Sequence, residues 1–471
     1  MTSIACPLSL NSRRHSTHWA LIDGKRRLNY SQLNAAVERT RRNLLAQGIK
    51  AGERVALLTD KTAEAIVLLL ALWRNRTVSV LPNRYLSAPA LARQLKKVGT
   101  SKRIQRADVR SLVDLNITTI PEIKPFRYAA EADLAIVFTS GTSQAPKPAL
   151  LSFANLYYNA KGANEHIPVN ASATWLLSLP IYHVGGLGII FRCLLGGAAI
   201  FVSRSNSSIE KDIQQERITH ISLVPTQLHQ LLANKKNILA LKKMKCILLG
   251  GAPMPKALLK RALALNLPLY ASYGCTEMAS QIATTNVIRK NTKHPLSASI
   301  LPYRRVRLSK SGEILVKGRT LFKGYQRSNA LDTGRGKDGW FPTGDLGQLT
   351  EKGELIVLGR KDNLMISGGE NIQPEEIEGH LSSLGLGRSC VIARKDRLFG
   401  ERPVAFIESS GKRKISLINV RKRLLKRAEK FKVPDEWYYW PQELSQSPLK
   451  TPRHELQQFY LNHKNKLRPI N

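Results

Sequence analysis

Apolar residues alternate along the chain between short β-branched runs and longer segments in which they recur at helical spacing. The short runs predict β-strands and the longer segments predict helices, because side chains repeat every second residue in a strand and every third or fourth in a helix. The clearest predicted strands and helices are Val55–Leu58, Leu134–Phe138, Ile218–Val224, Met244–Leu249, Leu28–Gln47 and Thr62–Trp73. This alternation is typical of layered α/β folds.

The pattern changes beyond about residue 300. Glu313–Val316 and Leu355–Leu358 are short apolar segments separated by glycine-rich turns, which predict small antiparallel sheets. A hinge is predicted at Gly359–Asp362, and the remaining segment of about 110 residues is enough for a small separate domain. We therefore expect a large multi-layer α/β domain over residues 1–360 that ends in a β-barrel-like region, followed by a mobile α+β domain over 361–471.

Basic residues outnumber acidic ones by more than two to one, with 73 Lys and Arg against 34 Asp and Glu and a formal charge of +39. Such a balance concerns partners and solubility rather than fold. The densest basic run, Lys412–Lys432, has apolar residues at helical spacing and predicts an amphipathic helix with a solvated charged face. The charge allows electrostatic association with an anionic membrane, and it keeps open a basic nucleic-acid-binding function, although no specific nucleic acid is expected.

The five cysteines are scattered and lack metal-type spacing, which is typical of reduced thiols in the cytoplasm. The beginning of the chain, Met1–Ser16, has no basic segment followed by an apolar one, so no signal peptide is predicted. The best apolar run, Ala65–Trp73, is shorter than the roughly 20 residues that span a bilayer. We expect a cytoplasmic protein that is a monomer or a homodimer.

A loop of small hydroxylated residues follows the predicted strand Leu134–Phe138 and ends in a lysine. Hydroxyls, backbone N–H groups and an ammonium can together bind phosphate oxygens. The loop is not a Walker A motif, because no second glycine precedes the lysine and Pro148 follows it. Its candidate phosphate-binding residues are Thr139, Ser140, Gly141, Thr142 and Lys147.

Three further motifs follow in order: Tyr273–Glu277, Gly339–Asp345, and Gly359–Asp362 continuing to Ser367–Ile372. Taken with the hydroxylated loop, they resemble the signatures of the adenylate-forming superfamily of acyl-CoA synthetases, adenylation domains and luciferases. The resemblance covers nearly the whole chain, from about Trp19 to about Leu456. It implies a two-step reaction in which ATP activates an acid as an acyl-adenylate, with ATP, Mg²⁺ and usually CoA as participants.

The resemblance implies a role for each matching residue of the ATP site. The Thr139–Lys147 loop would hold the β- and γ-phosphates, with Gln144 standing where the family usually has its second glycine. The adenine slot would be formed by Gly250, Gly251, Ala252, Tyr273 and Gly274, because glycines admit the purine and an aromatic ring can stack on it.

Four polar residues complete the implied ATP site. Thr276 would hold the α-phosphate, and Glu277 would hold Mg²⁺, a hard cation that prefers carboxylate oxygen. Asp345 would accept the two ribose hydroxyls, supported by Arg360. Without the flanking motifs, Asp345, which follows a glycine, would be interpreted as an ordinary turn residue.

The C-terminal domain would supply the residues that distinguish the two steps. Lys361 and Asp362 form the predicted hinge, and Gly368 and Gly369 resemble the segment that lines the CoA tunnel. Lys450 is the candidate catalytic lysine. It keeps the family's spacing to Arg453, although it lacks the usual preceding glycine.

The segments Trp175–Gly186, Ser222–Leu228 and Ser367–Glu376, with the short length of the chain, are most similar to o-succinylbenzoate–CoA ligases, a subfamily of menaquinone biosynthesis. This resemblance makes His183, Arg192 and Ser222 candidate acid-binding residues, with Arg192 facing the aromatic carboxylate because a buried charge needs a partner. A packed histidine at the end of a strand is the alternative for His183.

Two enzymatic alternatives stay open at this point. One is a CoA ligase for another aryl or fatty acid, and the other is an adenylation enzyme that loads a separate carrier protein. An inactive, basic nucleic-acid-binding protein is a third alternative, from a different class, and salt-dependent retention on DNA would favour it.

Overall fold

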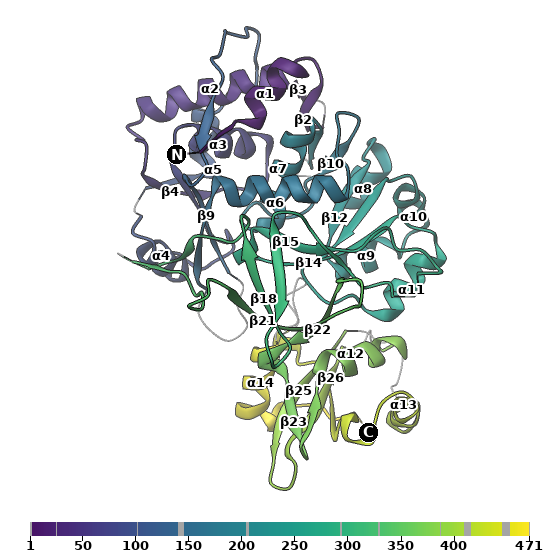
Figure 1. Ribbon diagram of the computed structural model, residues 1–471. Coiled ribbons are helices and arrows are strands. Elements are labelled where there is room, and N and C mark those ends of the chain that lie inside the picture. Colours follow the sequence, from purple (N-terminus) through teal and green to yellow (C-terminus); the bar gives the residue numbers. More distant parts are fainter. Residues whose placement is uncertain are drawn as a thin grey trace.

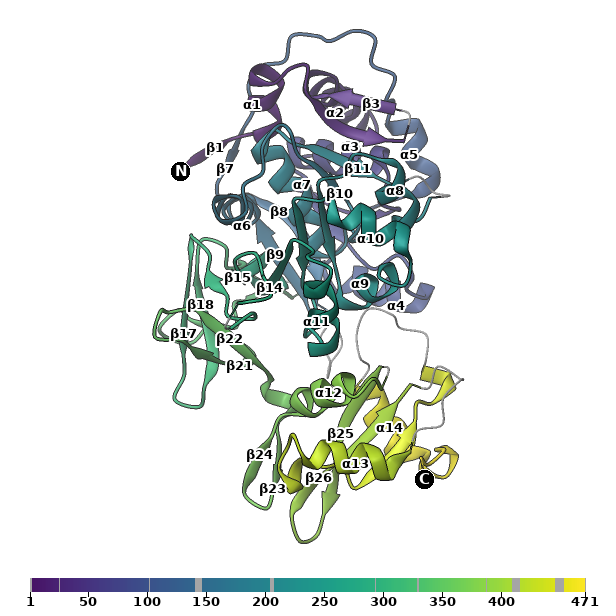
Figure 2. The same cartoon turned by 90° about the vertical axis from the view of Figure 1, so that its right-hand side faces the viewer.

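The computed structural model describes residues 2–24, 26–100, 102–139, 146–203, 207–292, 294–327, 330–386, 388–408, 416–444 and 453–470. Two large sheets with their helices form the upper part of the molecule in Figure 1. A small antiparallel sheet lies below them, and the chain beyond it forms a separate body at the bottom (Figures 1 and 2). The layered α/β architecture predicted from the sequence is confirmed.

One large sheet has seven strands in the order β20-β19-β9-β8-β5-β4-β6. Strands β8, β5, β4 and β6 are parallel, and β9 and β19 extend the sheet antiparallel. Its strands are β4 Arg54–Leu58, β5 Val78–Leu81, β6 Arg103–Gln105, β8 Asp133–Phe138, β9 Pro148–Ser152, β19 Gly324–Gln326 and β20 Leu331–Asp332. The helices in this part of the sequence are α3 Ala63–Arg74, α4 Ala88–Lys97 and α5 Arg106–Leu112.

The other large sheet has nine strands in the order β16-β15-β14-β13-β12-β10-β11-β2-β3, with a parallel centre from β14 to β2. Its strands are β2 Trp19–Asp23, β3 Arg26–Asn29, β10 Thr174–Leu176, β11 Ala199–Val202, β12 His220–Leu223, β13 Cys246–Leu249, β14 Leu269–Cys275, β15 Ser280–Thr284 and β16 Ser299–Ile300. The associated helices are α2 Tyr30–Ala46, α6 Phe153–His166, α7 Val184–Gly196, α8 Ile209–Gln215, α9 Pro225–Leu231, α10 Lys235–Lys242 and α11 Lys256–Ala264. Near the N-terminus, β1 Ser3–Ala5 pairs with β7 Arg127–Ala129, and α1 Pro7–Arg14 follows β1.

The small antiparallel sheet has the order β17-β18-β21-β22, with the strands β17 Arg304–Leu308, β18 Glu313–Gly318, β21 Phe341–Leu349 and β22 Leu355–Arg360. Register shifts interrupt the β18–β21 and β21–β22 ladders, and such bulges increase strand curvature. The sheet curls into half a barrel, as the glycine-rich antiparallel pattern predicted.

Beyond β22 the chain forms a five-stranded sheet whose apolar residues make clusters of their own, around Met365, Ile392 and Phe406 among others. Its strands are β23 Met365–Ser367, β24 Glu370–Ile372, β25 Ser389–Asp396, β26 Gly400–Ile407 and β27 Glu436–Tyr439, and its helices are α12 Pro374–Ser383, α13 Leu417–Leu425 and α14 Arg453–Asn462. Helix α12 packs against α11 of the upper part.

Local signals in the sequence explain several element boundaries. Helix α2 begins after a reciprocal capping pair, in which Asn29 Oδ1 accepts from the Gln32 N–H and Gln32 Oε1 accepts from the Asn29 N–H. The hydroxyl of Thr62 caps α3 by accepting from the Ala65 N–H. Of the described residues in the basic helix predicted over Lys412–Lys432, α13 covers Leu417–Leu425, and a 3₁₀ turn follows at Lys430–Lys432.

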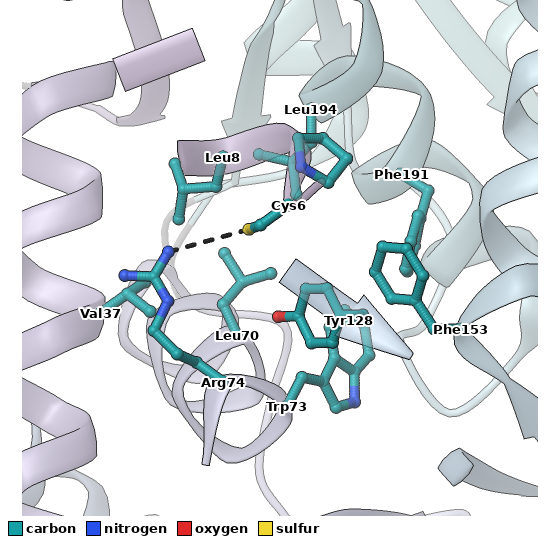
Figure 3. A pocket seen from close by; sticks show the side chains of 11 residues that line it. Cys6, Leu8, Val37, Leu70, Trp73, Arg74, Tyr128, Phe153, Phe191 and Leu194 are labelled. Carbon is teal, nitrogen blue, oxygen red and sulfur yellow. Dashed lines mark hydrogen bonds between the residues drawn. The ribbon is translucent and has the colours of Figure 1, made fainter. Parts of the chain in front are cut away.

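A small apolar cavity lies in the core between α1, α3 and α7 (Figure 3). Its volume is about 20 Å³, room for one water molecule at most. Arg74 is 3% exposed, and its Nη2 donates to Cys6 Sγ at 3.8 Å. This cavity belongs to the packing of the core and is too small for a substrate. Among the described residues, no helix is long and apolar enough to cross a membrane.

Candidate active site

Tyr273, Asp345 and Arg360 form a hydrogen-bonded cluster where the nine-stranded sheet meets the small sheet. The Tyr273 hydroxyl donates to Asp345 Oδ2 at 2.7 Å, and Arg360 Nη1 donates to Asp345 Oδ1 at 3.1 Å. Burial raises the pKa of Asp345, while the Tyr273 hydroxyl and the Arg360 charge act in the opposite direction. Asp345 is thus a partly desolvated, oriented carboxylate that can accept hydrogen bonds from a pair of hydroxyls.

A second cluster joins Glu277 to Lys147 through the ring of Tyr325. The Tyr325 hydroxyl donates to Glu277 Oε1 at 2.6 Å, and Lys147 Nζ lies 5.2 Å from the centroid of the Tyr325 ring. Burial and the Glu277 charge both raise the pKa of Tyr325, so its hydroxyl stays protonated as a donor. A carboxylate and an ammonium on either side of one ring suit a phosphate that carries its own metal ion.

The two clusters share the end of β14. The charges of Glu277 and Asp345 both raise the pKa of the Cys275 thiol, after burial as the largest cause, so both carboxylates lie close to that strand end. Thr276 begins the short 3₁₀ turn Thr276–Met278 that presents Glu277. The two residues after this turn, Ala279 and Ser280, have positive φ angles of 57° and 123°. Non-glycine residues held in this region cluster at functional sites.

The phosphate-loop prediction is only partly within the described residues. The Thr139 N–H donates to the Lys147 carbonyl at 2.9 Å, and the Lys147 N–H donates to Thr139 Oγ1 at 3.1 Å. These bonds close the base of the loop between β8 and β9. Ser140, Gly141, Thr142 and Gln144 lie outside the described residues.

The predicted adenine slot lies along the adjacent ends of β13 and β14. Gly250, Gly251 and Ala252 follow β13, and an added Cβ on Gly250 would lie 3.3 Å from the Ser272 carbonyl oxygen. Parallel strands β12, β13 and β14 end along the same edge, where ligands bind in open α/β sheets. The structure therefore brings these residues to the same edge as Tyr273 and Glu277.

Trp175 organises the predicted acid-binding region. Its indole Nε1 donates to Ser222 Oγ at 3.2 Å, and the Arg192 guanidinium lies 4.4 Å from its ring centroid. His220 packs on the same ring at 5.0 Å, and burial lowers the pKa of His220 to about 4, so it is neutral at pH 7. Ser222 and Arg192 are thus brought together through one buried aromatic ring.

Arg192 is 2% exposed and donates to several protein acceptors. Its Nε donates to Asn164 Oδ1 at 2.8 Å, its Nη2 to the Ile167 carbonyl at 3.0 Å, and its Nη1 to Gln281 Oε1 at 3.3 Å. Burial lowers the pKa of Arg192 to about 10, which leaves it charged at pH 7. Pairing with the acid's carboxylate stays a prediction. This geometry favours a role in which Arg192 orients Trp175 and its neighbours.

His183 is the N-cap residue of α7, and its ring lies 4.7 Å from that of Tyr182. The helix that it precedes reaches the active-site turn, because a Cβ on Gly188 would lie 3.7 Å from Ser280 Oγ. His183 is therefore on the helix that runs past the turn presenting Glu277. Its role in acid binding stays a prediction.

A sequence profile described as “AMP-binding enzyme” matches residues 8–326, which is more than half of the chain. This chain belongs to the AMP-binding enzyme family. Two curated relatives of this AMP-binding enzyme are named 2-succinylbenzoate–CoA ligase. The protein from Geobacillus sp. (strain WCH70) is 30% identical over 470 residues, covering 95% of both chains. The protein from Bacillus licheniformis is 30% identical over 462 residues, covering 93% of this chain and 96% of its own.

Solved structures resemble this AMP-binding enzyme over nearly the whole chain. The o-succinylbenzoate CoA synthetase from Bacillus subtilis in complex with its acyl-adenylate intermediate superposes with a TM-score of 0.83 at 27% identity, covering 97% of this chain and 99% of that one. The same protein in complex with ATP and magnesium ion gives a TM-score of 0.81 at 27% identity, covering 97% and 100%. The predicted resemblance to adenylate-forming enzymes is confirmed.

The residues of the AMP-binding enzyme fit a magnesium ion that arrives with its nucleotide. Glu277 offers a hard carboxylate oxygen, the ligand type that Mg²⁺ prefers. Among the described residues, no group of three or more His, Cys, Asp or Glu side chains is arranged to hold a metal. An ion at Glu277 would therefore take its other oxygens from phosphates and water.

The two glycines predicted to face CoA, Gly368 and Gly369, do not lie near the cluster of Tyr273, Asp345 and Glu277. Gly368 and Gly369 have φ angles of 60° and 85° and form the two-residue turn between β23 and β24, a turn type that requires positive φ at both positions. Figures 1 and 2 place β23 on the side of the C-terminal body that faces away from the large sheets. Lys450 lies outside the described residues.

Arg453, three residues after Lys450, is firmly anchored at the start of α14. Its Nη1 donates to Glu375 Oε1 at 3.0 Å and its Nη2 to Glu378 Oε1 at 2.5 Å. Burial raises the pKa of Glu378 to about 7, and Arg453 opposes that rise. Glu375 also accepts from Asn363 Nδ2 at 2.6 Å, so α14 is tied through Glu375 to the 3₁₀ turn Lys361–Asn363.

The sequence alone did not reveal Tyr325 as a site residue. Tyr325 lies 48 positions from Glu277, and no local motif connects the two. The only signal was an aromatic residue after Gly324 in a region of predicted antiparallel strands. Trp175 was read as part of the acid-pocket segment, but its contacts with Ser222 and Arg192 depend on pairing between distant strands.

Gly274 gives a prediction about the backbone of this site. A Cβ at Gly274 would lie 1.8 Å from the Ser280 carbonyl oxygen, so β14 and β15 could not keep their spacing. Gly274→Ala should lower the free energy of unfolding by about 1–3 kcal/mol or more and lower the melting temperature measured by calorimetry. Gly379→Ala is the matched control, because nothing lies within 4 Å and alanine favours a helix. Equal melting temperatures for both variants would contradict this account.

Proposed function

We propose that this protein is an ATP-dependent acid–CoA ligase that converts 2-succinylbenzoate to 2-succinylbenzoyl-CoA, with AMP and pyrophosphate as the other products. The observation that carries the proposal is the pair of clusters at one strand end, the Asp345 carboxylate held by Tyr273 and Arg360 beside the Glu277 carboxylate near Lys147. A relative named for this reaction matches across 95% of both chains. This proposal places the protein in menaquinone biosynthesis.

The proposed roles in ATP binding follow from position. Asp345 accepts hydrogen bonds from the ribose hydroxyls, and Arg360 supports it. Both carboxylate oxygens of Asp345 are already oriented, one by Tyr273 and the other by Arg360. Thr276 contacts the α-phosphate, and Glu277 holds Mg²⁺, which neutralises phosphate charge when bound. Adenine lies against Gly250, Gly251, Ala252, Tyr273 and Gly274, and the loop with Thr139, Ser140, Gly141, Thr142 and Lys147 holds the β- and γ-phosphates.

The proposed reaction has two halves. A carboxylate oxygen of the acid attacks the α-phosphorus, the bond to the bridging oxygen breaks, and pyrophosphate leaves, with Lys450 opposing the charge that develops. CoA thiolate then attacks the acyl carbon, and AMP leaves. Both steps depend on positioning and charge stabilisation rather than on a covalent enzyme intermediate. The C-terminal domain, residues 361–471, would turn between the halves about Lys361 and Asp362 and bring Gly368 and Gly369 to the CoA path.

The proposed acid pocket uses His183, Arg192 and Ser222. Ser222 and Arg192 both contact Trp175, and His183 begins the helix that carries Arg192. A cytoplasmic location, a monomeric or dimeric state and association with an anionic membrane remain predictions.

The test is the release of AMP from a panel of acids, with and without CoA. With CoA present, 2-succinylbenzoate should release AMP far faster than benzoate or octanoate. Equal rates for octanoate and 2-succinylbenzoate would contradict the substrate assignment and leave the ligase class intact. Turnover only with an acyl carrier protein would favour the carrier-loading alternative.

A further inference from the structure

One carboxylate, that of Glu313, touches both the nucleotide-binding strand and the hinge. Glu313 begins β18, and its side chain is 12% exposed. Its Oε1 accepts from the Gly344 N–H at 3.0 Å, and its Oε2 accepts from Lys361 Nζ at 2.9 Å. Gly344 immediately precedes Asp345, and Lys361 immediately follows Arg360. Glu313 therefore contacts the neighbours in sequence of both members of the Asp345–Arg360 pair.

The contact with Gly344 occurs where the strand ladder is interrupted. The register between β18 and β21 shifts between Glu313 and Leu315, so the regular ladder offers no backbone acceptor to the Gly344 N–H. The Glu313 side chain supplies the missing acceptor, and Thr343 Oγ1 adds a bond to the Ile314 carbonyl at 2.8 Å. These bonds hold the backbone from which the Asp345 side chain projects.

The contact with Lys361 depends on the domain arrangement. Glu313 and Gly344 both belong to the small sheet, whereas Lys361 begins the 3₁₀ turn Lys361–Asn363 at the hinge. The bond to Glu313 raises the pKa of Lys361. A turn of the chain about Lys361 and Asp362 redirects the Lys361 side chain and leaves the bond between Glu313 and Gly344 in place.

We propose that Glu313 is a positioning residue for adenylation, which holds Gly344 and thereby Asp345 in place for the ribose while Lys361 engages it only in the domain arrangement seen here. This inference rests on the proposed function. The ion pair then favours the arrangement seen here, in which Gly368 and Gly369 lie away from the site as proposed for adenylation (Figures 1 and 2), over the turned arrangement. The Gly344 bond favours nucleotide binding in both. An ion pair as exposed as that of Lys361 shifts such an equilibrium by a factor of about two to five.

Three variants separate the two contacts. Glu313→Ala removes both, Glu313→Gln keeps an acceptor for Gly344 and loses the charge, and Lys361→Met loses only the ion pair. The dissociation constant for MgATP should rise about tenfold in Glu313→Ala, as expected for one lost hydrogen bond, and stay near that of the wild type in Glu313→Gln and Lys361→Met. The latter two should slow pyrophosphate release by about two- to fivefold and leave thioester formation from preformed acyl-adenylate undiminished. Lys352→Met, at an exposed turn, is the matched control and should change neither value.

An unchanged MgATP dissociation constant in a folded Glu313→Ala variant would overturn the proposal. So would equal increases in Glu313→Ala and Glu313→Gln, because charge rather than positioning would then be the cause. Equal slowing of both half-reactions in Lys361→Met would overturn the dependence on domain arrangement. The proposed function fails if the wild-type protein activates none of the acids in the panel. Calorimetric titration with MgATP needs no acid, so it tests the role of Glu313 even in that case.

Discussion

Lys450→Ala should lose most of the pyrophosphate release from acid and ATP while keeping thioester formation from preformed acyl-adenylate near the wild-type rate. The proposed role of Lys450 is to oppose charge in the first transition state, and loss of one such preorganised charge costs roughly 10²–10³-fold in rate. Under the proposed function, the C-terminal domain turns before the second half-reaction and takes Lys450 away from the site. Rapid-quench measurement of each half-reaction separates the two rates.

Two further variants make this result decisive. Gly369→Leu should do the reverse, slowing thioester formation and sparing adenylation, because its turn lies far from the ATP cluster in the arrangement seen here. Lys466→Ala removes an exposed lysine of the same domain and should change neither rate. If Lys450→Ala slows both halves equally, Lys450 contacts CoA or supports the domain, and the two-arrangement account fails.

Glu277→Gln should show the second large effect, a steep fall in adenylation together with a higher Mg²⁺ requirement. Glutamine keeps the shape of the side chain and an acceptor for Tyr325 but removes the charge that attracts the metal. Titration of the adenylation rate with Mg²⁺ at fixed ATP measures the change. Tyr325→Phe is the matched control, because it removes the hydrogen bond and keeps the charge. It should lower the rate by about tenfold or less without changing the Mg²⁺ midpoint. An unchanged midpoint in Glu277→Gln would mean that the carboxylate is structural.

The secondary structure could be predicted where a run of apolar residues with one spacing coincides with a single strand or helix. β4, β8 and β13 lie within two residues of the predicted strands, because a short β-branched run bounded by polar residues has few alternatives. The run Lys412–Lys432 was predicted as one helix, but among its described residues the α-helix covers Leu417–Leu425 and ends before a separate 3₁₀ turn at Lys430–Lys432. Its later apolar residues, including Phe431, pack on the C-terminal core after the helix has ended. The spacing of apolar residues therefore does not predict where the helix ends, because residues beyond its end are also buried by tertiary packing.

The candidate site could also be predicted only in part from the sequence. Tyr273 and Glu277 could be predicted because they are neighbours in one motif, and the structure keeps them at one strand end. The bond from Tyr325 to Glu277 and the bond from Gly344 to Glu313 could not, because each joins strands whose pairing is set by the whole fold. Arg192 is buried, and its binding to the acid stays a prediction. Its protein partners could not be predicted from the sequence, because they come from distant segments.

The burial of the cysteines has a consequence for the fate of the activated acid. An acyl-adenylate will acylate any thiolate it meets, including one from the enzyme itself. Cys275 stands directly before Thr276, yet burial and the charges of Glu277 and Asp345 raise the pKa of its thiol well above the usual value. Burial also raises the pKa of Cys193, Cys246 and Cys390, and Cys6 is buried. Under the proposed function, the low thiolate content of these side chains disfavours self-acylation, so that the incoming thiol is the acyl acceptor.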